Sequence, residues 1–242
     1  LCKMFGIDFW VNSAFGNRVE AVQQGDTIKT RLTNLPFLEE HIREHLRSGI
    51  LVWLDLLQDY KVWHSKLLLE NFPGLFVTRE GFFCWRPEEP RAQFLRHATW
   101  FNAVEKARKY PIFVYELFNE VCYEDHSPYN YRQFRREMAE KYGTIERANA
   151  KWGTSFRSFD AVVPPGGGRL TEIVNGVSPQ LKADWSWFTE RRFAAIAGES
   201  VAWLHKVVPG ARATLQSYNG LPFDFQNNFV NPFLVNPQLD LT

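Results

Sequence analysis

Cysteine is scarce in this chain of 242 residues. The three cysteines, Cys2, Cys84 and Cys122, lie far apart, are odd in number and form no C-x-x-C pair. Zinc ribbons and disulfide frameworks need paired or clustered cysteines, so neither of these is indicated. The sequence therefore predicts three free thiols.

Long apolar runs and an excess of one charge are also missing. The longest apolar run, GILVWLDLL, is interrupted by Asp55 and is far shorter than the roughly 20 residues of a membrane span. The 28 basic and 27 acidic residues leave a net charge of +1. We therefore predict neither a membrane nor a nucleic-acid partner. No signal-peptide pattern opens the chain, which leaves cytoplasmic and secreted locations both open.

Two motifs of other enzyme classes are absent. The six histidines are scattered and form no H-E-x-x-H pattern. The glycines of VVPPGGG lack the order G-x-x-x-x-G-K-[ST] that cradles a phosphate. A zinc-protease motif and a phosphate-binding loop are therefore not predicted.

Aromatic residues, in contrast, are abundant: they make up 16% of the chain and include nine tryptophans. Most must pack in a core, but this density also suits a sugar-binding cleft, because aromatic faces stack on the apolar faces of pyranose rings. Trp53, Trp100 and Trp203 lie in apolar stripes, which predicts core positions, whereas Trp85 could be a stacking platform.

The apolar pattern predicts helices and strands in alternation. The expected helices end at Gly49, span residues 92–109, 131–142 and 180–208, and include a short one between Thr144 and Trp152. The expected strands lie within 4–12, 50–57, 112–118 and 211–218, and another could begin in PQLDLT at the end of the chain. Such alternation implies βα units and a parallel sheet, either doubly wound or closed into a barrel.

The strand 112–118 is followed by Asn119 and Glu120. In parallel α/β folds the chemistry lies at the carboxyl ends of the strands. A glutamate half desolvated there would favour its neutral form and could donate a proton near neutral pH, and the amide suits a sugar hydroxyl. The alternative is a glutamate that caps a helix or faces solvent. Glu116 would need a basic partner inside a barrel or would pair with a helix outside it, and its role stays open.

The following block, YRQFRREMAEKYGTIERANAKWGTSFRSFDAVVPP, resembles glycoside hydrolase family 42, the β-galactosidase family of a clan of retaining (β/α)8-barrel glycosidases. In that family a strand ending in Asn-Glu is followed by a KYGTIE..N..WGT.F signature. The signature consists here of Lys141, Tyr142, Gly143, Thr144, Ile145, Glu146, Asn149, Trp152, Gly153, Thr154 and Phe156. The resemblance extends through SPQLKADWSWFTERRF and back to FVTREGFFCW, and covers about residues 35–242. KYPIFVYELFNE is also similar to mannan-cleaving members of the clan.

The resemblance implies the roles of individual residues. Glu120 matches the family's general acid/base, and Asn119 matches the amide that binds the hydroxyl next to the anomeric carbon. Arg79 lies close to the position of a substrate-binding arginine, and we count Trp85 with the substrate-binding residues. Cys84 lies near one ligand of a zinc site found in many members, but the cysteine cluster expected after Asn-Glu is replaced by VCYEDHSPYN. We therefore expect no structural zinc, and no cofactor is implied.

The strand count predicts an incomplete barrel. With 112–118 as strand four, the predicted strands correspond to strands two to five and the beginning of strand six. We therefore expect an α/β chain in which residues 1–242 form part of one catalytic (β/α)8-barrel (TIM barrel) domain, about strands two to six, without its first and last strands. In this clan the nucleophile is a glutamate at the end of strand seven, so it is expected beyond Thr242. Glu190 and Glu199 are on a helix and are not expected to replace it.

The leading functional hypothesis is a retaining, exo-acting β-galactosidase that uses Glu120 as its general acid/base on a carbohydrate substrate. A β-mannosidase or an endo-acting mannanase or agarase of the same clan is one alternative. A carbohydrate-binding relative that has lost the chemistry is another. The resemblance also implies a homo-oligomer, a trimer. Residues 1–242 alone are expected to have no hydrolase activity.

Overall fold

The computed structural model of the chain describes residues 9–13, 19–24, 27–32, 35–56, 77–79, 82–84, 103–121, 128–165, 178–217 and 231–241. Residues 103–107 are helical. The other elements are, in chain order, β1 (Phe9–Ser13), β2 (Val19–Gln24), β3 (Thr27–Leu32), α1 (Leu35–Arg47), β4 (Leu51–Asp55), β5 (Val77–Arg79), β6 (Phe82–Cys84), β7 (Ile112–Val121), α4 (Pro128–Tyr142), α5 (Ile145–Trp152), η3 (Phe159–Ala161), α7 (Pro179–Val207), β8 (Ala213–Ser217), α9 (Pro232–Val235) and η4 (Asn236–Gln238).

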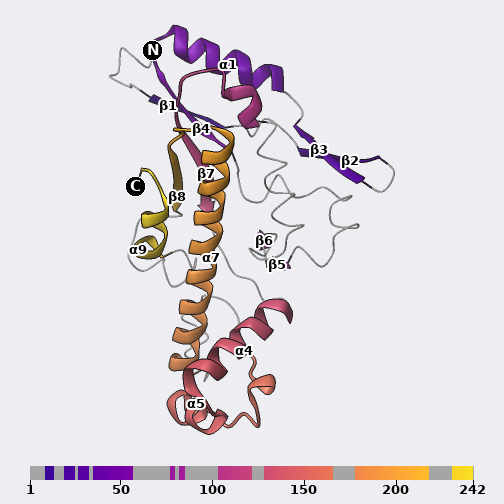
Figure 1. Cartoon of the computed structure of the whole chain (residues 1–242), viewed down its shortest axis with the longest axis vertical. Helices are drawn as coiled ribbons and strands as arrows, with labels where there is room; N and C mark the ends of the chain where they lie inside the picture. The colour runs from indigo at the N-terminus through magenta and orange to yellow at the C-terminus, as the bar shows by residue number, and fades with distance from the viewer. Residues whose placement is uncertain are drawn as a thin grey trace.

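Four strands form the central sheet in the order β1-β4-β7-β8, and every pairing between them is parallel (Figure 1). Each strand is therefore added on the same side as the chain proceeds. A doubly wound sheet reverses this order, whereas a (β/α)8 barrel keeps it. The backbone N–H groups of Asp240 and Leu241 donate to the carbonyl of Ala213, so the chain returns beside β8 where the sixth strand was expected. The fold is thus an incomplete (β/α)8 barrel.

The helix α1 and the strand β4 form where the apolar pattern predicts them. Leu38 and Ile42 are buried on the inner side of α1, and Gly49 ends the helix with a φ of +68°. Only glycine adopts such a left-handed conformation without a steric penalty. Val52 and Leu54 of β4 then pack in the same hydrophobic cluster as Ile42.

The helix α7 joins two hydrophobic clusters. It has 29 residues and is about 43 Å long, and its C-terminal half packs on the sheet through residues such as Ile196 and Leu204. Its N-terminal half packs against α4 and α5 through Leu181, Trp185 and Phe188. Neither α7 nor any other described helix is both long and apolar enough to cross a membrane.

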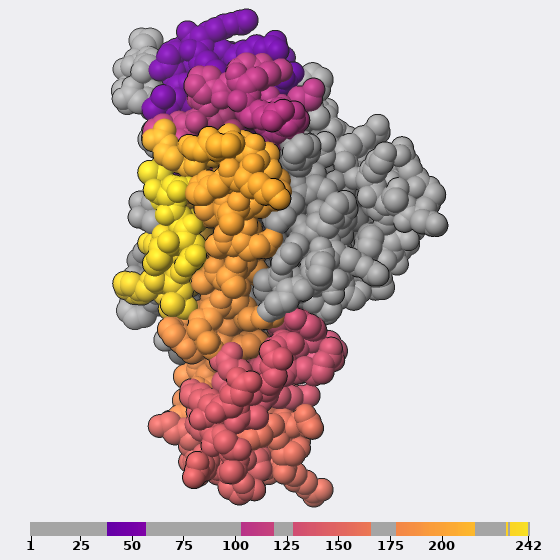
Figure 2. Space-filling model, viewed as in Figure 1, coloured from indigo at the N-terminus to yellow at the C-terminus, as the bar shows by residue number. Residues whose placement is uncertain are grey.

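The second cluster forms a lobe beyond the sheet. We call α4, α5, η3 and residues 179–192 of α7 the α4–α5 lobe; Figures 1 and 2 show it at the lower end of the molecule. Because α7 connects two parallel strands, it runs antiparallel to them, and its N-terminal half extends past their carboxyl ends. The lobe therefore stands on the side of the sheet where barrel enzymes carry out chemistry.

Asp184 of α7 holds this lobe together. Its carboxylate accepts hydrogen bonds from Lys141 Nζ at 2.5 Å, from Tyr142 Oη at 2.6 Å and from Trp152 Nε1 at 2.8 Å. Burial works against the charge of Lys141, but the hydrogen bond and charge of Asp184 outweigh it and raise the pKa of the lysine. The K-Y and W positions of the signature thus converge on one carboxylate that links three helices.

The remaining polar signature residues shape the turn after α5. Asn149 Oδ1 accepts from Thr154 Oγ1 at 2.8 Å and from the backbone N–H of Phe156 at 3.0 Å, while its Nδ2 donates to the Phe156 carbonyl at 2.8 Å. The Thr144 hydroxyl caps the N-terminus of α5, as predicted, and Gly153 ends the helix with a φ of +68°. The signature therefore encodes the lobe rather than catalytic groups.

Replacing Asp184 with alanine should lower the free energy of unfolding by about 2–4 kcal/mol, because the buried Trp152 indole N–H loses its acceptor and two further hydrogen bonds are lost. Lys141→Met should lower it by less than about 1 kcal/mol, because that side chain is 48% exposed. Urea unfolding near neutral pH measures both effects. Asp160→Ala, at an exposed position of η3, is the matched control. Equal losses for the two aspartate variants would contradict the role of the network.

Candidate active site

Asn119 and Glu120 lie within the last three residues of β7. The strand ends at Val121 and not at residue 118, so the sequence-based boundary was too early. The apolar pattern stops at residue 118, but the backbone ladder with β8 continues because it needs only peptide groups. The two predicted site residues are therefore part of the sheet, at the carboxyl end of one of its inner strands.

Glu120 occupies a β-bulge. Asn119 pairs with Gln216 and Val121 pairs with Ser217, so two steps along β7 match one step along β8, and Glu120 is the extra residue. Bulges bend a strand, aim a side chain in a new direction and are frequent next to active sites. Glu120 thus has no register partner on β8, whereas Asn119 and Val121 each have one.

A second bulge lies earlier in the same strand. Glu116 pairs with Thr214 and Phe118 pairs with Leu215, which leaves Leu117 as the extra residue. Leu117 and Phe118 both pack in the hydrophobic cluster beneath the helices, which strict alternation along a strand would not allow. The bulge at Leu117 allows these two consecutive side chains to pack in the same cluster.

A row of polar residues crosses the sheet below Glu120. The strand registers pair Ser13 with Asp55, Asp55 with Glu116, and Glu116 with Thr214. Glu116 is 0% and Asp55 is 1% exposed. Their apolar neighbours on β4 and β7 pack beneath the helices, so the alternation of strand side chains places both carboxyls on the inner face. The indole N–H of Trp53 donates to Glu116 Oε2 at 2.6 Å.

This contact shows in part how the charged residue Glu116 is accommodated within a strand. The residue faces the interior, and an indole is one of its partners. Trp53, predicted as a core residue, is only partly buried and ties β4 to β7 through this hydrogen bond. The pairing was not visible in the sequence, because the two residues are 63 positions apart.

Replacing Trp53 with phenylalanine should lower the free energy of unfolding by about 1.5–3 kcal/mol, since a buried carboxyl loses a donor. The same replacement in a Glu116→Met background should be less damaging by about 1 kcal/mol or more. Chemical unfolding of the wild type, both single variants and the double variant measures this coupling. Additive effects would show that the bond does not join the two strands energetically.

The other predicted site residues lie in a separate strand pair or outside the described residues. Arg79 is the last residue of β5 and pairs with Phe82 across a hairpin that forms a sheet of its own. Trp85 lies outside the described residues. Cys84 ends β6, and no three His, Cys, Asp or Glu residues in the described parts of the chain come together as a metal site.

Two polar residues of α7, which sequence reasoning did not assign to the site, anchor the segments that follow β7 and β8. Glu190 Oε2 accepts from Asn231 Nδ2 at 2.8 Å, next to the start of α9. Burial raises the pKa of Glu190, and this hydrogen bond partly opposes the shift. Arg192 donates to Asn130 in the first turn of α4 at 3.3 Å, and burial lowers its pKa to about 10. Glu190 therefore has a structural contact from α7 to Asn231.

Comparison with known proteins points to one enzyme family. A family model described as β-galactosidase, that of glycoside hydrolase family 42, matches residues 75–241. No curated protein matches the chain.

Solved structures share the fold. The β-galactosidase of Bacillus circulans sp. alkalophilus is 17% identical, with a TM-score of 0.67 over 99% of this chain and 35% of that one. The β-galactosidase of Rahnella sp. R3 is 16% identical, with a TM-score of 0.63 over 90% and 31%. The catalytic domain of a Paenibacillus polymyxa β-amylase is 14% identical, with a TM-score of 0.66 over 99% and 69%. The chain spans about a third of the length of the two β-galactosidases.

Proposed function

The chain belongs to glycoside hydrolase family 42, and from this premise we propose that it carries the acid/base side of a retaining β-galactosidase site. The observation that supports this most directly is the position of Glu120, in a bulge at the carboxyl end of an inner strand of a barrel-type sheet. The family match extends across this strand.

Glu120 would act twice in the reaction. Retaining hydrolysis uses two carboxyls roughly 5–5.5 Å apart. In the first step Glu120 gives its proton to the departing alcohol while the second carboxyl attacks the anomeric carbon. In the second step the Glu120 carboxylate takes a proton from the water that releases the sugar. The negative charge of an ionised nucleophile favours the protonated form of Glu120 before the first step.

Asn119 would position the substrate. Its amide can donate to and accept from the hydroxyl next to the anomeric carbon, whose hydrogen bonds strengthen as the oxocarbenium-like transition state forms. Arg79 and Trp85 complete the proposed substrate-binding set. Arg79 would donate hydrogen bonds to a sugar hydroxyl, and Trp85 would stack on the apolar face of the pyranose ring.

Replacing Glu120 with glutamine in the full-length protein should reduce kcat for a poorly activated galactoside by about 10²–10⁴-fold, because the amide cannot protonate the leaving alcohol. An aryl galactoside with a good leaving group needs little protonation and should lose much less in its first step. Steady-state and burst kinetics on both substrates measure the difference. Glu44→Gln, an exposed position of α1, is the matched control. Near-wild-type turnover of the poorly activated galactoside would remove Glu120 from this role.

The sugar specificity has a second candidate assignment. KYPIFVYELFNE is similar to mannan-cleaving members of the clan, which motivates a β-mannosidase or an endo-acting mannanase or agarase as the second candidate. A panel of aryl glycosides distinguishes them. We expect kcat/KM for the β-galactoside to exceed that for the β-mannoside at least about tenfold, as pocket contacts typically give. Faster cleavage of the mannoside would overturn the galactoside assignment but leave the acid/base assignment intact.

A further inference from the structure

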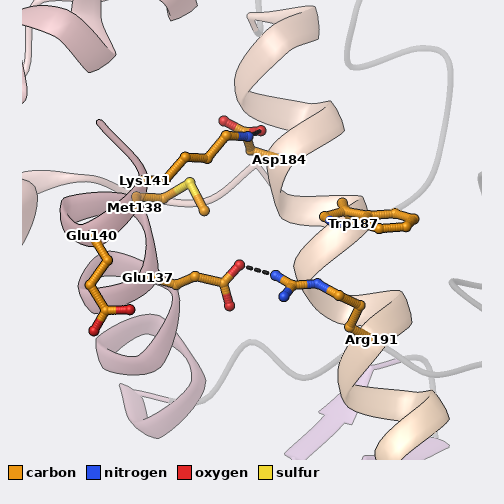
Figure 3. Close-up of a pocket in the computed structure, with 7 residues that line it drawn as sticks. All are labelled: Glu137, Met138, Glu140, Lys141, Asp184, Trp187 and Arg191. Carbon is orange, nitrogen blue, oxygen red and sulfur yellow. Dashed lines mark hydrogen bonds and ion pairs between the residues drawn. The ribbon is translucent and has the colours of Figure 1, made fainter. Parts of the chain in front are cut away.

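A groove of about 390 Å³ lies between α4 and α7 in the α4–α5 lobe (Figure 3). Its size is within the range of sites that bind small ligands. We call it the α4–α7 groove. Its walls are formed by Glu137, Met138, Glu140, Lys141, Asp184, Trp187 and Arg191. None of these residues has a part in the proposed reaction at Glu120.

Trp187 is the unusual member of this set. It is 47% exposed, whereas Trp152 and Trp185 of the same lobe are almost completely buried. Among the described residues, only Trp187 and Phe233 are exposed large aromatic side chains. The Arg191 guanidinium lies 5.9 Å from the centre of the Trp187 ring, so a cation and an aromatic surface adjoin in the same wall.

Hydrogen-bonding groups line the same groove. Arg191 pairs with Glu137 across the groove, as Figure 3 shows, but a guanidinium has five donors and this side chain is 42% exposed. Glu140 is exposed and makes no hydrogen bond or ion pair with any described residue. Asp184 is different, because both of its oxygens already accept hydrogen bonds within the lobe. Arg191 and Glu140 therefore remain available to a ligand.

The charges of the groove favour a neutral ligand. Three carboxylates face two cations, so the groove has no strong field that would select an anion or a cation. An exposed indole face with a guanidinium beside it, in a groove that also has the available carboxylate of Glu140 in its wall, matches a pyranose ring, which has an apolar face and a rim of hydroxyls. We propose that the α4–α7 groove binds a pyranose unit of a carbohydrate chain, separately from the active site. Trp187 is the stacking platform, and Arg191 and Glu140 bind hydroxyls.

The proposal does not depend on the chemistry of Glu120. It adds a second sugar contact on the lobe that stands at the carboxyl-end side of the sheet. Such a contact would hold a longer saccharide near the enzyme and would leave the cleavage of a small aryl glycoside unchanged. A second copy of this chain could also cover the groove, and the experiment below separates the two.

Fluorine NMR of the full-length protein labelled with 5-fluorotryptophan tests the proposal. The Trp187 signal is identified as the one missing from the Trp187→Phe spectrum, and Glu120→Gln in all samples prevents consumption of the probe. Addition of β-1,4-galactobiose should move this signal saturably, with a Kd on the order of 1 mM. Glu140→Gln keeps the Trp187 signal and should raise the galactobiose concentration at which the shift of that signal is half complete.

Phe233→Ala, which removes the other exposed aromatic side chain, is the matched control and should leave the shift unchanged. With Glu120 intact, Trp187→Ala should hydrolyse a small aryl galactoside within about twofold of the wild-type rate, as expected for a surface change. A Trp187 signal that does not move with the sugar would overturn the proposal. So would a signal that moves only with protein concentration, since that would identify the groove as an interface between copies.

Discussion

The hydrogen-bonded pairing of β7 with β4 on one side and with β8 on the other determines where Asn119 and Glu120, the proposed site residues, lie. Parallel strands added in chain order bring all their carboxyl ends to one edge, and β7 is an inner strand of that sheet. The ladder with β8 is regular except at two bulges, and the second contains Glu120. A bulge at this place bends the backbone locally at Glu120.

The α4–α5 lobe is organised around a different interaction. Asp184 binds a lysine, a tyrosine and an indole from two other helices, and these three residues belong to the signature by which the family is recognised. This explains why a signature without catalytic groups identifies a glycosidase family. The lobe follows the strand that carries Glu120 and stands beyond its carboxyl end.

Local signals made much of the fold predictable from the sequence. Gly49 and Thr144 predicted where α1 ends and where α5 begins, because a left-handed turn and a helix cap depend on single residues. The apolar pattern located every strand of the central sheet but ended β7 at residue 118. An apolar pattern shows which side chains are buried and does not show which backbone groups pair. The bulge at Glu120 depends on β8, almost 100 residues away, and no local pattern encodes it. The partners of Asp184 were hidden for the same reason: they are 32 to 43 positions distant.

The central claim is that Glu120 is the acid/base of a retaining glycosidase. Azide rescue of a Glu120→Ala variant of the full-length protein tests it most directly, because azide is a nucleophile that needs no general base. If Glu120 activates water in the second step, azide should accelerate turnover of an activated aryl β-galactoside and yield the β-galactosyl azide, with the configuration retained after two inversions. A variant that is unaffected by azide, or that forms the α-azide, would contradict the account.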